Sequence, residues 1–457
     1  MDYPAATRYL ISLGNEVRAA SLDSAQAAKL GLENITELLA DLGWPQDAYP
    51  SVLVGGTNGK GSTAAMLEAV VRAARLRSAL YTSPHLVEIN ERIQSRGRPI
   101  PPAEFAALFT ALRARIERLL AEGRLRFHPT YFECLTAMGF EYFRREQCEM
   151  AVIEVGMGGR LDATNTATPR VAVITQIDLD HERFLGATVR AIAAEKAGII
   201  KRGGVVVSAA AHPEAAAVIR AKAEEQGARL VETWREYSAE GLSSAGGRYS
   251  FQAAHADGFR LPVEPALRGR HQVENALAAV AAARELARQG LLPIRDEHIR
   301  EGLAAARWPG RLEVIREEPL VLLDGAHNPA GARALARFWE ESLSGRRVAL
   351  VYGAMRDKAV PEIAEILFPK AQLVVLTRPE QFRAAAPEAV RDLASHLHPN
   401  IVIEPEPPAA LARALAAASP RDAILVTGSL FLVGDIKRHC AALVRSAEEV
   451  PTATSRC

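Results

Sequence analysis

The sequence contains few cysteines, little net charge and no long apolar run. Its four cysteines, Cys134, Cys148, Cys440 and Cys457, form no CxxC pair and no metal-type spacing, which fits a reducing compartment and a place in packing or at the surface. The formal net charge is +1, so bulk electrostatics gives no reason to expect nucleic acid or an anionic membrane as a partner. The longest apolar run, AILVTGSLFLVG, has about a dozen residues, whereas a membrane span needs roughly 20.

The first residues, MDYPAATRYL, carry an early acid and lack the basic and long apolar regions of a signal peptide. We therefore expect a cytoplasmic protein that acts on small molecules, and we expect it to be a monomer. With 49% apolar and 24% charged residues the chain is globular, and its 457 residues are too many for one ordinary core. Two domains are the simplest prediction.

Short β-branched runs alternate with longer alanine-rich stretches, which is typical of a mostly parallel sheet covered by helices. Buried strands are predicted at SVLVG, RSALYT, MAVIEVG and RVAVITQI, with helices at Lys60–Arg75, at Pro129–Glu146 and from about His271. Between about Ala228 and Leu267 the runs become short and alternating, and SSAGG and HADG interrupt them, so we expect a small antiparallel patch there.

A second α/β domain is predicted after the segment RWPGRLE, where Pro309 and Gly310 separate a helix from a strand and suggest a hinge. Beyond it, PLVLLDG, RRVALVYG, AQLVVLT and AILVTG again alternate with helices. The prediction is an α/β protein with an N-terminal domain over residues 1–307, a linker over 308–311 and a Rossmann-like C-terminal domain over 312–457.

The stretch VLVGGTNGKGS indicates a phosphate-binding loop. An apolar strand leads into glycines that can adopt positive φ, and Lys60 follows them at a helix start. The common pattern GxxxxGK[ST] has a hydroxyl residue directly after the lysine, but Gly61 stands there. Ser83, at the carboxyl end of the RSALYT strand, is a candidate to replace that hydroxyl at a magnesium ion, because ligands of parallel sheets gather at this edge. A simple glycine-rich turn is the alternative.

Two further strand ends carry candidate metal ligands. Glu154 ends the strand in MAVIEVG, and Asp178, Asp180 and His181 follow the strand in RVAVITQI. Magnesium bound to phosphates keeps several waters and takes one or two carboxylates, so Ser83, Glu154 and His181 would suffice. Alternatively, Glu154 is a turn residue and His181 a member of a surface ion pair.

The motifs resemble those of the folylpolyglutamate synthase and dihydrofolate synthase branch of the Mur ligase superfamily. The resemblance covers nearly the whole chain and rests on GTNGKGS, TSPHL, EVGMGGRLDATN, DLDH, AAEKAGIIK, GRHQVENALAA, WPGRLE, LDGAHNP and TGSLFLVGDIK, which occur in family order. It implies an ATP-dependent ligase that joins glutamate to the carboxylate of dihydropteroate and to the γ-carboxylate of folylpolyglutamates through an acyl phosphate. The N-terminal domain would then bind ATP and folate, and the C-terminal one would be the glutamate-ligase domain.

The resemblance also implies residue roles. The nucleotide would be bound by Gly56, Thr57, Asn58, Gly59, Lys60, Gly61, Ser62, Asn275, Arg311, Asp324 and His327, and the metal by Ser83, Glu154, His181 and Lys196. Two Mg²⁺ ions are expected, with K⁺ as an additional candidate. By the resemblance Lys196 is carbamylated by carbon dioxide, which would turn a cation into an anionic metal ligand. Taken without the resemblance, Lys196 reads as a solvated helix residue.

Substrate residues follow from the same resemblance. Phe132 would stack on the pterin, Asp162 would pair with its guanidine-like edge, and Thr130 and Ser429 lie on substrate-binding segments. Phe132 could instead be a core residue and Asp162 a loop cap. Lys60, Lys196 and His327 are the expected catalytic residues, with His327 assisting deprotonation of the glutamate amine, and closure about Gly310 and Arg311 would assemble the site.

Two other functions compete with this one. A cell-wall Mur-type ligase would carry an extra domain of about a hundred residues before the phosphate loop, whereas about fifty residues precede it here. A P-loop ATPase with a conformational output would keep the GK[ST] pattern intact.

Overall fold

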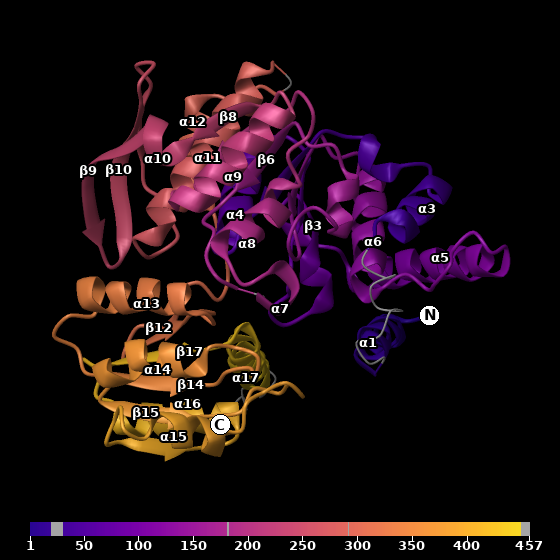
Figure 1. Ribbon diagram of the computed structural model, residues 1–457. Helices are drawn as coiled ribbons and strands as arrows, with labels where there is room; N and C mark the ends of the chain where they lie inside the picture. The colour runs from indigo at the N-terminus through magenta and orange to yellow at the C-terminus, as the bar shows by residue number, and fades with distance from the viewer. Residues whose placement is uncertain (20–30, 181, 291, 449–457) are drawn as a thin grey trace, which may run out of the picture. The chain divides into compact units, whose positions relative to one another are not determined.

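The computed structural model describes residues 1–19, 31–180, 182–290 and 292–448. Contacts divide the chain into two compact units (Figure 1). Unit 1 comprises Met1–Ser244, Arg248–Ala266 and His271–Arg307, and unit 2 comprises Ala245–Gly247, Leu267–Arg270 and Trp308–Cys457. Each unit is described by itself.

Unit 1 is built on an eight-stranded sheet of order β4-β3-β2-β5-β1-β6-β7-β8. Its strands are β1 (Ser51–Gly55), β2 (Ser78–Tyr81), β3 (Ile93–Ser95), β4 (Arg98–Pro99), β5 (Met150–Glu154), β6 (Val171–Ile174), β7 (Val205–Ser208) and β8 (Arg229–Glu232). β1 lies between β5 and β6 and pairs with both in parallel, whereas β3 and β4 form an antiparallel edge. The central strands are buried along their whole length, because helices cover both faces and leave no side for water.

The helices of unit 1 pack on this sheet and on one another (Figure 1). They are α1 (Tyr3–Ala19), α3 (Glu33–Asp41), α4 (Lys60–Ala73), α5 (Pro102–Ala121), α6 (Tyr131–Arg145), α7 (Glu182–Leu185), α8 (Val189–Ala197), α9 (Pro213–Glu225), α10 (Thr233–Glu236), α11 (His271–Arg288) and α12 (Asp296–Ala305). α4 packs against α11 and α12 and is buried along most of its length, while α1, α5 and α6 pack on one another.

The predicted antiparallel patch is present but begins later than expected. β9 (Tyr237–Ala245), β10 (Arg248–His255) and β11 (Arg260–Val263) form a three-stranded sheet, in which β10 and β11 pair antiparallel. The prediction was wrong for the first residues of the range, since β8 pairs in parallel with β7 at the end of the large sheet. β8 is exposed at its first residue and buried at its last two, and it forms the edge of the large sheet.

Unit 2 contains a six-stranded sheet of order β12-β13-β17-β14-β15-β16. The strands are β12 (Glu313–Arg316), β13 (Leu320–Leu323), β14 (Val348–Tyr352), β15 (Leu373–Leu376), β16 (Ile401–Ile403) and β17 (Ala423–Thr427), and only β12 runs antiparallel to its neighbour. The α-helices among the described residues of this unit are α13 (Pro329–Ser342), α14 (Val360–Leu367), α15 (Pro387–Ala394), α16 (Pro407–Ala417) and α17 (Leu430–Glu448). The predicted fold class is therefore confirmed for both parts of the chain.

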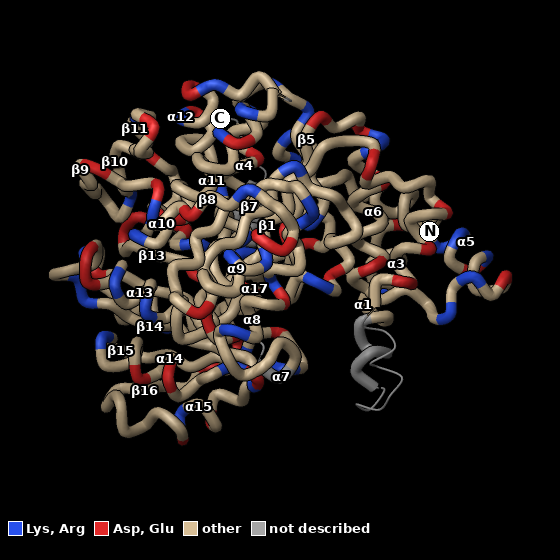
Figure 2. The backbone as a smooth tube through the Cα atoms, turned by 45° about the horizontal axis from the view of Figure 1, so that its top comes forward, with Lys and Arg blue, Asp and Glu red and all other residues tan. Residues whose placement is uncertain are grey.

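Charged residues of both signs are interspersed. Along α3 and α5, basic and acidic residues lie close together (Figure 2), and Arg115 and Arg118 form ion pairs with Asp41 at 3.1 and 2.6 Å. Such exposed pairs contribute little stability each. Across the described part of the chain, no helix combines the length and the apolar character that crossing a bilayer requires.

Candidate active site

The loop between β1 and α4 has the backbone of an anion site. Gly56 and Gly59 adopt φ values of 141° and 90°, which side chains disfavour, and α4 begins directly at Lys60. A Cβ atom at Gly56 would lie 1.8 Å from Oγ1 of Thr175, so only glycine fits there. The first turn of α4 presents backbone N–H groups that no side chain caps, an arrangement that favours a bound phosphate.

Contacts with the segment after β6 hold this loop in place. The Thr57 amide donates to the carbonyl oxygen of Gln176 at 2.8 Å, and the Thr57 hydroxyl donates to the carbonyl oxygen of Asp178 at 3.0 Å. Nζ of Lys60 folds back over the loop and donates to the carbonyl oxygens of Gly56 and Thr57, both at 3.1 Å. The ammonium group therefore sits above the loop, where a terminal phosphate would meet it.

Lys196 is buried beside the same loop, and its placement corrects the reading of a solvated helix residue. It lies near the end of α8, is 4% exposed, and its Nζ donates to the carbonyl oxygen of Gly56 at 2.8 Å. Burial, and after it the nearby Lys60 ammonium, lowers the pKa of Lys196 to about 7, against the opposing pull of Asp180 and Asp162. A substantial fraction of this amine is neutral at physiological pH, which an ordinary lysine is not.

Glu154 and Ser83 meet at the carboxyl edge of the sheet. Glu154 is the buried last residue of β5, and its Oε2 accepts a hydrogen bond from the Ser83 amide at 3.1 Å. The predicted ligand His181 lies outside the described residues. Among the residues that the structure does describe, no three His, Cys, Asp or Glu side chains come close enough to hold a metal by themselves.

The predicted pterin residues Phe132 and Asp162 are brought together around Gly156. A Cβ atom at Gly156 would lie 2.5 Å from the Phe132 ring and 3.0 Å from Oδ2 of Asp162, so glycine allows both side chains to approach the backbone. Phe132 is half-buried at the start of α6, edge-on to Tyr81. Asp162 is buried, and burial raises the pKa of its carboxyl although hydrogen bonds from Thr164, Met157 and Gly156 oppose the shift. Asp162 also caps a short 3-10 helix, as the alternative interpretation had it.

In unit 2, four predicted residues gather where β13 and β17 end side by side. Asp324 accepts hydrogen bonds from the amides of Leu312 and Ala326 at 3.0 and 2.9 Å, and burial raises the pKa of its carboxyl against the attraction of Arg311. Nδ1 of His327 lies 2.8 Å from the Gly325 carbonyl oxygen, which requires a proton on Nδ1 and makes Nε2 the basic nitrogen of the neutral ring.

Ser429 lies just after β17, and its hydroxyl accepts a hydrogen bond from the Phe431 amide at 3.1 Å, at the start of α17. The predicted hinge residues are attached to unit 2 as well. The Gly325 amide donates to the carbonyl oxygen of Gly310 at 2.9 Å, and a Cβ atom at Gly325 would lie 2.5 Å from the Arg311 guanidinium. Gly310 has φ 72°. The hinge itself stays a prediction.

Comparisons with known proteins identify the family. Residues 129–283 match the model of the Mur ligase middle domain, and residues 310–430 match that of the Mur ligase, glutamate ligase domain. The chain is 38% identical over 407 residues to the folylpolyglutamate synthase of Lacticaseibacillus casei, covering 88% of this chain and 93% of the relative. It is 35% identical over 418 residues to the dihydrofolate synthase/folylpolyglutamate synthase of Bacillus subtilis, covering 90% and 95%.

The chain belongs to the folylpolyglutamate synthase and dihydrofolate synthase family.

Solved structures of the family agree with this assignment. The Mycobacterium tuberculosis folylpolyglutamate synthase complexed with ADP matches with a TM-score of 0.86 and 33% identity over 96% of this chain and 99% of that one. Escherichia coli FolC in complex with DHPP and ADP matches with a TM-score of 0.83 and 30% identity over 96% and 98%. As a member of this family the chain is an ATP-dependent ligase, and the resemblance found in its motifs is confirmed.

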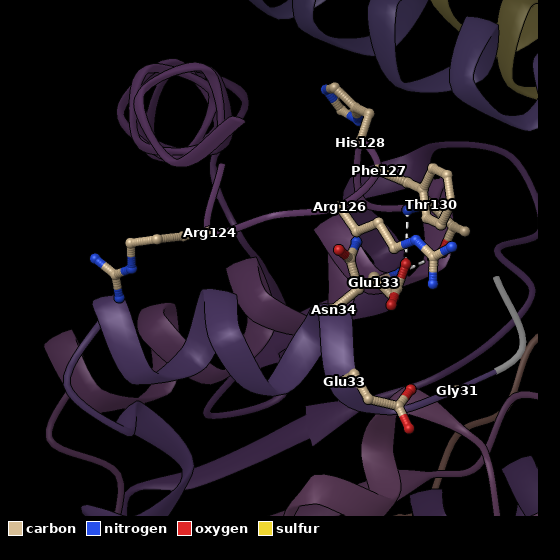
Figure 3. Close-up of a pocket in the computed structure, with 9 residues that line it drawn as sticks. All are labelled: Gly31, Glu33, Asn34, Arg124, Arg126, Phe127, His128, Thr130 and Glu133. Carbon is tan, nitrogen blue, oxygen red and sulfur yellow. Dashed lines mark hydrogen bonds between the residues drawn. The ribbon is translucent and has the colours of Figure 1, made fainter. Parts of the chain in front are cut away.

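A pocket of this folate-ligase chain lies beside one predicted substrate residue (Figure 3). Its volume is about 180 Å³, and it is lined by Gly31, Glu33, Asn34, Arg124, Arg126, Phe127, His128, Thr130 and Glu133. Thr130 and Glu133 cap α6 reciprocally, with Thr130 N donating to Oε2 of Glu133 at 2.7 Å and Glu133 N donating to Oγ1 of Thr130 at 3.2 Å. Because Glu133 fixes the first turn of α6, it also fixes the backbone that carries Phe132.

Sequence reasoning on the folate-ligase motifs missed Gln272. This residue of α11 is 2% exposed, and its carboxamide bonds both Asn275, at 2.9 Å, and Ser62, at 3.3 Å. Of the motif HQVEN, the resemblance assigned only Asn275 to the nucleotide. A glutamine near a helix start does not by itself indicate a functional role. Two features together could have indicated Gln272. The helix α11 is rich in alanine and therefore packs closely on a partner helix, and a polar residue on its buried face needs a polar partner.

Proposed function

We propose that the protein joins L-glutamate to dihydropteroate and to the γ-carboxylate of folylpolyglutamates, using ATP and releasing ADP and phosphate. The observation that carries the proposal is the convergence, at one sheet edge, of Lys60, buried Lys196 and the Glu154–Ser83 pair around the phosphate loop. Members of this family named for both activities support the two substrates.

The first step needs charge stabilisation, because a carboxylate is a poor acceptor for an amine until it becomes an acyl phosphate. The loop amides and the Lys60 ammonium would hold the transferring phosphoryl group and offset its charge, and this positioning is the main source of rate in phosphoryl transfer. The contacts of Lys60 with Gly56 and Thr57 hold its ammonium group ready, so little reorganisation is needed when ATP binds.

Magnesium is part of the proposal, and the described residues fit it. Glu154 is a buried carboxylate at the edge where the phosphates would be, next to Ser83, and carboxylate and hydroxyl oxygens are ligands that Mg²⁺ takes. Glu154 and Ser83 would hold the ion together with His181 and a carbamylated Lys196. When bound, Mg²⁺ would supply neutralisation of phosphate charge. Two ions are proposed, and K⁺ is a further candidate.

The second step is attack of the glutamate amine on the acyl phosphate. In unit 2, His327 has its proton on Nδ1 and a basic Nε2, so it would accept a proton from the amine. Ser429 lies just after the neighbouring strand β17 and would contact the amino acid, while Asp324 and Arg311 would bind the nucleotide. Phe132, Asp162 and Thr130 would bind the pterin. We also propose residues 1–307, 308–311 and 312–457 as the functional division, and a monomer.

A cytoplasmic location completes the proposal. Cys134, Cys148 and Cys440 are free thiols, and the first two are buried, as packing residues in a reducing compartment would be.

Mass spectrometry of the products tests the function directly. The protein is supplied with ATP, Mg²⁺ and glutamate together with either dihydropteroate or tetrahydrofolate. We expect a product one glutamyl unit heavier from each acceptor, with one ADP released per amide formed. ATP hydrolysis without amide formation would overturn the proposal and favour an ATPase. Product from only one acceptor would limit the protein to that activity.

A further inference from the structure

The N-terminal turn of α11 is hydrogen-bonded to the phosphate loop within unit 1. Nε2 of Gln272 donates to Oγ of Ser62 at 3.3 Å, and Nδ2 of Asn275 donates to Oε1 of Gln272 at 2.9 Å. The three side chains are buried, at 3%, 2% and 6% exposed for Ser62, Gln272 and Asn275. Buried polar groups cost stability unless they are paired, and here they are paired with one another.

Asn275 contacts the loop backbone as well. A Cβ atom at Gly59 would lie 2.3 Å from Oδ1 of Asn275, and Gly59 is the residue whose positive φ turns the loop into α4. The carboxamide of Asn275 is therefore pressed against the point where the loop changes direction. Asn275 therefore lies against Gly59, the residue before Lys60, and Gln272 bonds Ser62, two residues after Lys60.

We propose that Gln272 is a positioning residue that sets the phosphate loop for the triphosphate of ATP, acting through Ser62 and supported by Asn275. Because the Ser62 hydroxyl accepts a hydrogen bond from Gln272, its own proton would be directed away from Gln272 and would donate to a phosphate oxygen. Ser62 lies in the first turn of α4, where the backbone N–H groups are uncapped. The inference rests on the proposed use of ATP, and it assigns Gln272 to the phosphates rather than to the base.

The test is calorimetric titration of ATP and of inorganic tripolyphosphate, both with Mg²⁺, into the whole protein and its Gln272→Leu variant. The change removes the carboxamide and keeps a side chain of similar volume. We expect both ligands to bind about five- to tenfold more weakly, as loss of the one buried hydrogen bond that reaches Ser62 predicts. In the ligase assay the KM for ATP should rise by a similar factor, and the KM for glutamate should stay within a factor of two.

A double-mutant cycle identifies the path. If Gln272 acts through Ser62, the variant carrying both Gln272→Leu and Ser62→Ala should bind ATP no more weakly than the worse of the single variants. Gln289→Leu is the matched control, because Gln289 lies directly after α11, is exposed, and its side chain donates to the Arg170 carbonyl oxygen at 3.2 Å. It should bind ATP as the parent does.

The remaining outcomes would contradict either the role of Gln272 or the proposed use of ATP. Weaker ATP binding with unchanged tripolyphosphate binding would mean that Gln272 recognises the base, and additive losses would mean that it does not act through Ser62. Unchanged binding of both ligands would remove Gln272 from the loop. A parent protein that does not bind ATP would overturn the proposed function itself. If Gln272→Leu does not fold, as shown by thermal unfolding, Gln272→Met carries the same test.

Discussion

Lys196→Ala should abolish most ligase activity, and added acetate or formate should restore part of it. The reason is the pKa of Lys196, about 7 where an ordinary lysine has 10.5. The neutral amine is the form that reacts with carbon dioxide. At pH 7 about half of the Lys196 side chains are neutral, against roughly one in three thousand for an ordinary lysine. The environment of the phosphate loop therefore raises the reactive fraction by about a thousandfold or more.

The carbamate formed in this way would carry a carboxylate on a long stem, next to the carbonyl oxygen of Gly56. Removing the stem with Lys196→Ala leaves a space that a small free carboxylate fills at an entropic cost. We expect at least a hundredfold loss of the rate of ADP release, and a several-fold recovery at about 0.1 M acetate. Lys201→Ala is the matched control: its Nζ donates to the Asn165 carbonyl oxygen, burial lowers its pKa as well, and acetate should not affect this variant.

The pH dependence provides a second assay. Since the folded-state pKa is depressed to about 7, the reactive amine is lost as the pH falls through that value. At constant dissolved carbon dioxide, the neutral fraction drops from about nine-tenths at pH 8 to about one-tenth at pH 6, so activity should fall and added carbon dioxide should offset the loss. The reasoning would be refuted if methylamine rescued Lys196→Ala and acetate did not, or if ¹³C-bicarbonate gave no carbamate signal in the active parent.

Four further substitutions test the site. Glu154→Gln should lower ligation by at least about a hundredfold without unfolding the protein, because it removes charge where the ion would bind and keeps the volume; near-parent activity would exclude Glu154. Phe132→Ala and Asp162→Ala should impair use of dihydropteroate more than calorimetric ATP affinity, and an equal fall in both would mean that these residues do not bind the pterin. Gly59→Ala should weaken ATP binding and lower the melting temperature, since its Cβ would meet Asn275 at 2.3 Å; parent-like binding would show that the loop adapts.

The elements that the sequence predicted best are those whose signal is local. β1, β5, β6 and β17 are continuous apolar runs because helices bury both faces of a parallel sheet, so they were found within three residues of their ends. The phosphate loop was found because glycines, a lysine and a helix start follow one another in the chain. The caps of α6 and α13 depend on neighbouring residues too: the Asn328 side chain accepts a hydrogen bond from the Gly331 amide at the start of α13.

The features that it missed depend on distant contacts. The buried Lys196 donates a hydrogen bond to the carbonyl oxygen of Gly56, which lies 140 residues earlier in the chain. Gly159 allows the chain to pass close beside Lys196, since a Cβ atom at Gly159 would lie 3.0 Å from the Lys196 Cα. Gln272 pairs with Ser62, 210 residues away. β8 was assigned to the antiparallel patch because its four residues, RLVE, do not distinguish a strand that pairs in parallel at a sheet edge from a strand of a hairpin.

The place of β5 between β1 and β2 determines when the sheet can form during synthesis. β1 bonds only β5 and β6, and β2 bonds β3 and β5, so the first two strands never pair with each other. β1 must wait for Met150–Glu154 to leave the ribosome, roughly one hundred residues later, or about 5 to 20 s at ordinary rates of translation. For that time the apolar strand SVLVG has no strand partner in its own chain. A nascent or truncated chain that stops before Met150 thus exposes an unpaired edge to other chains and to chaperones.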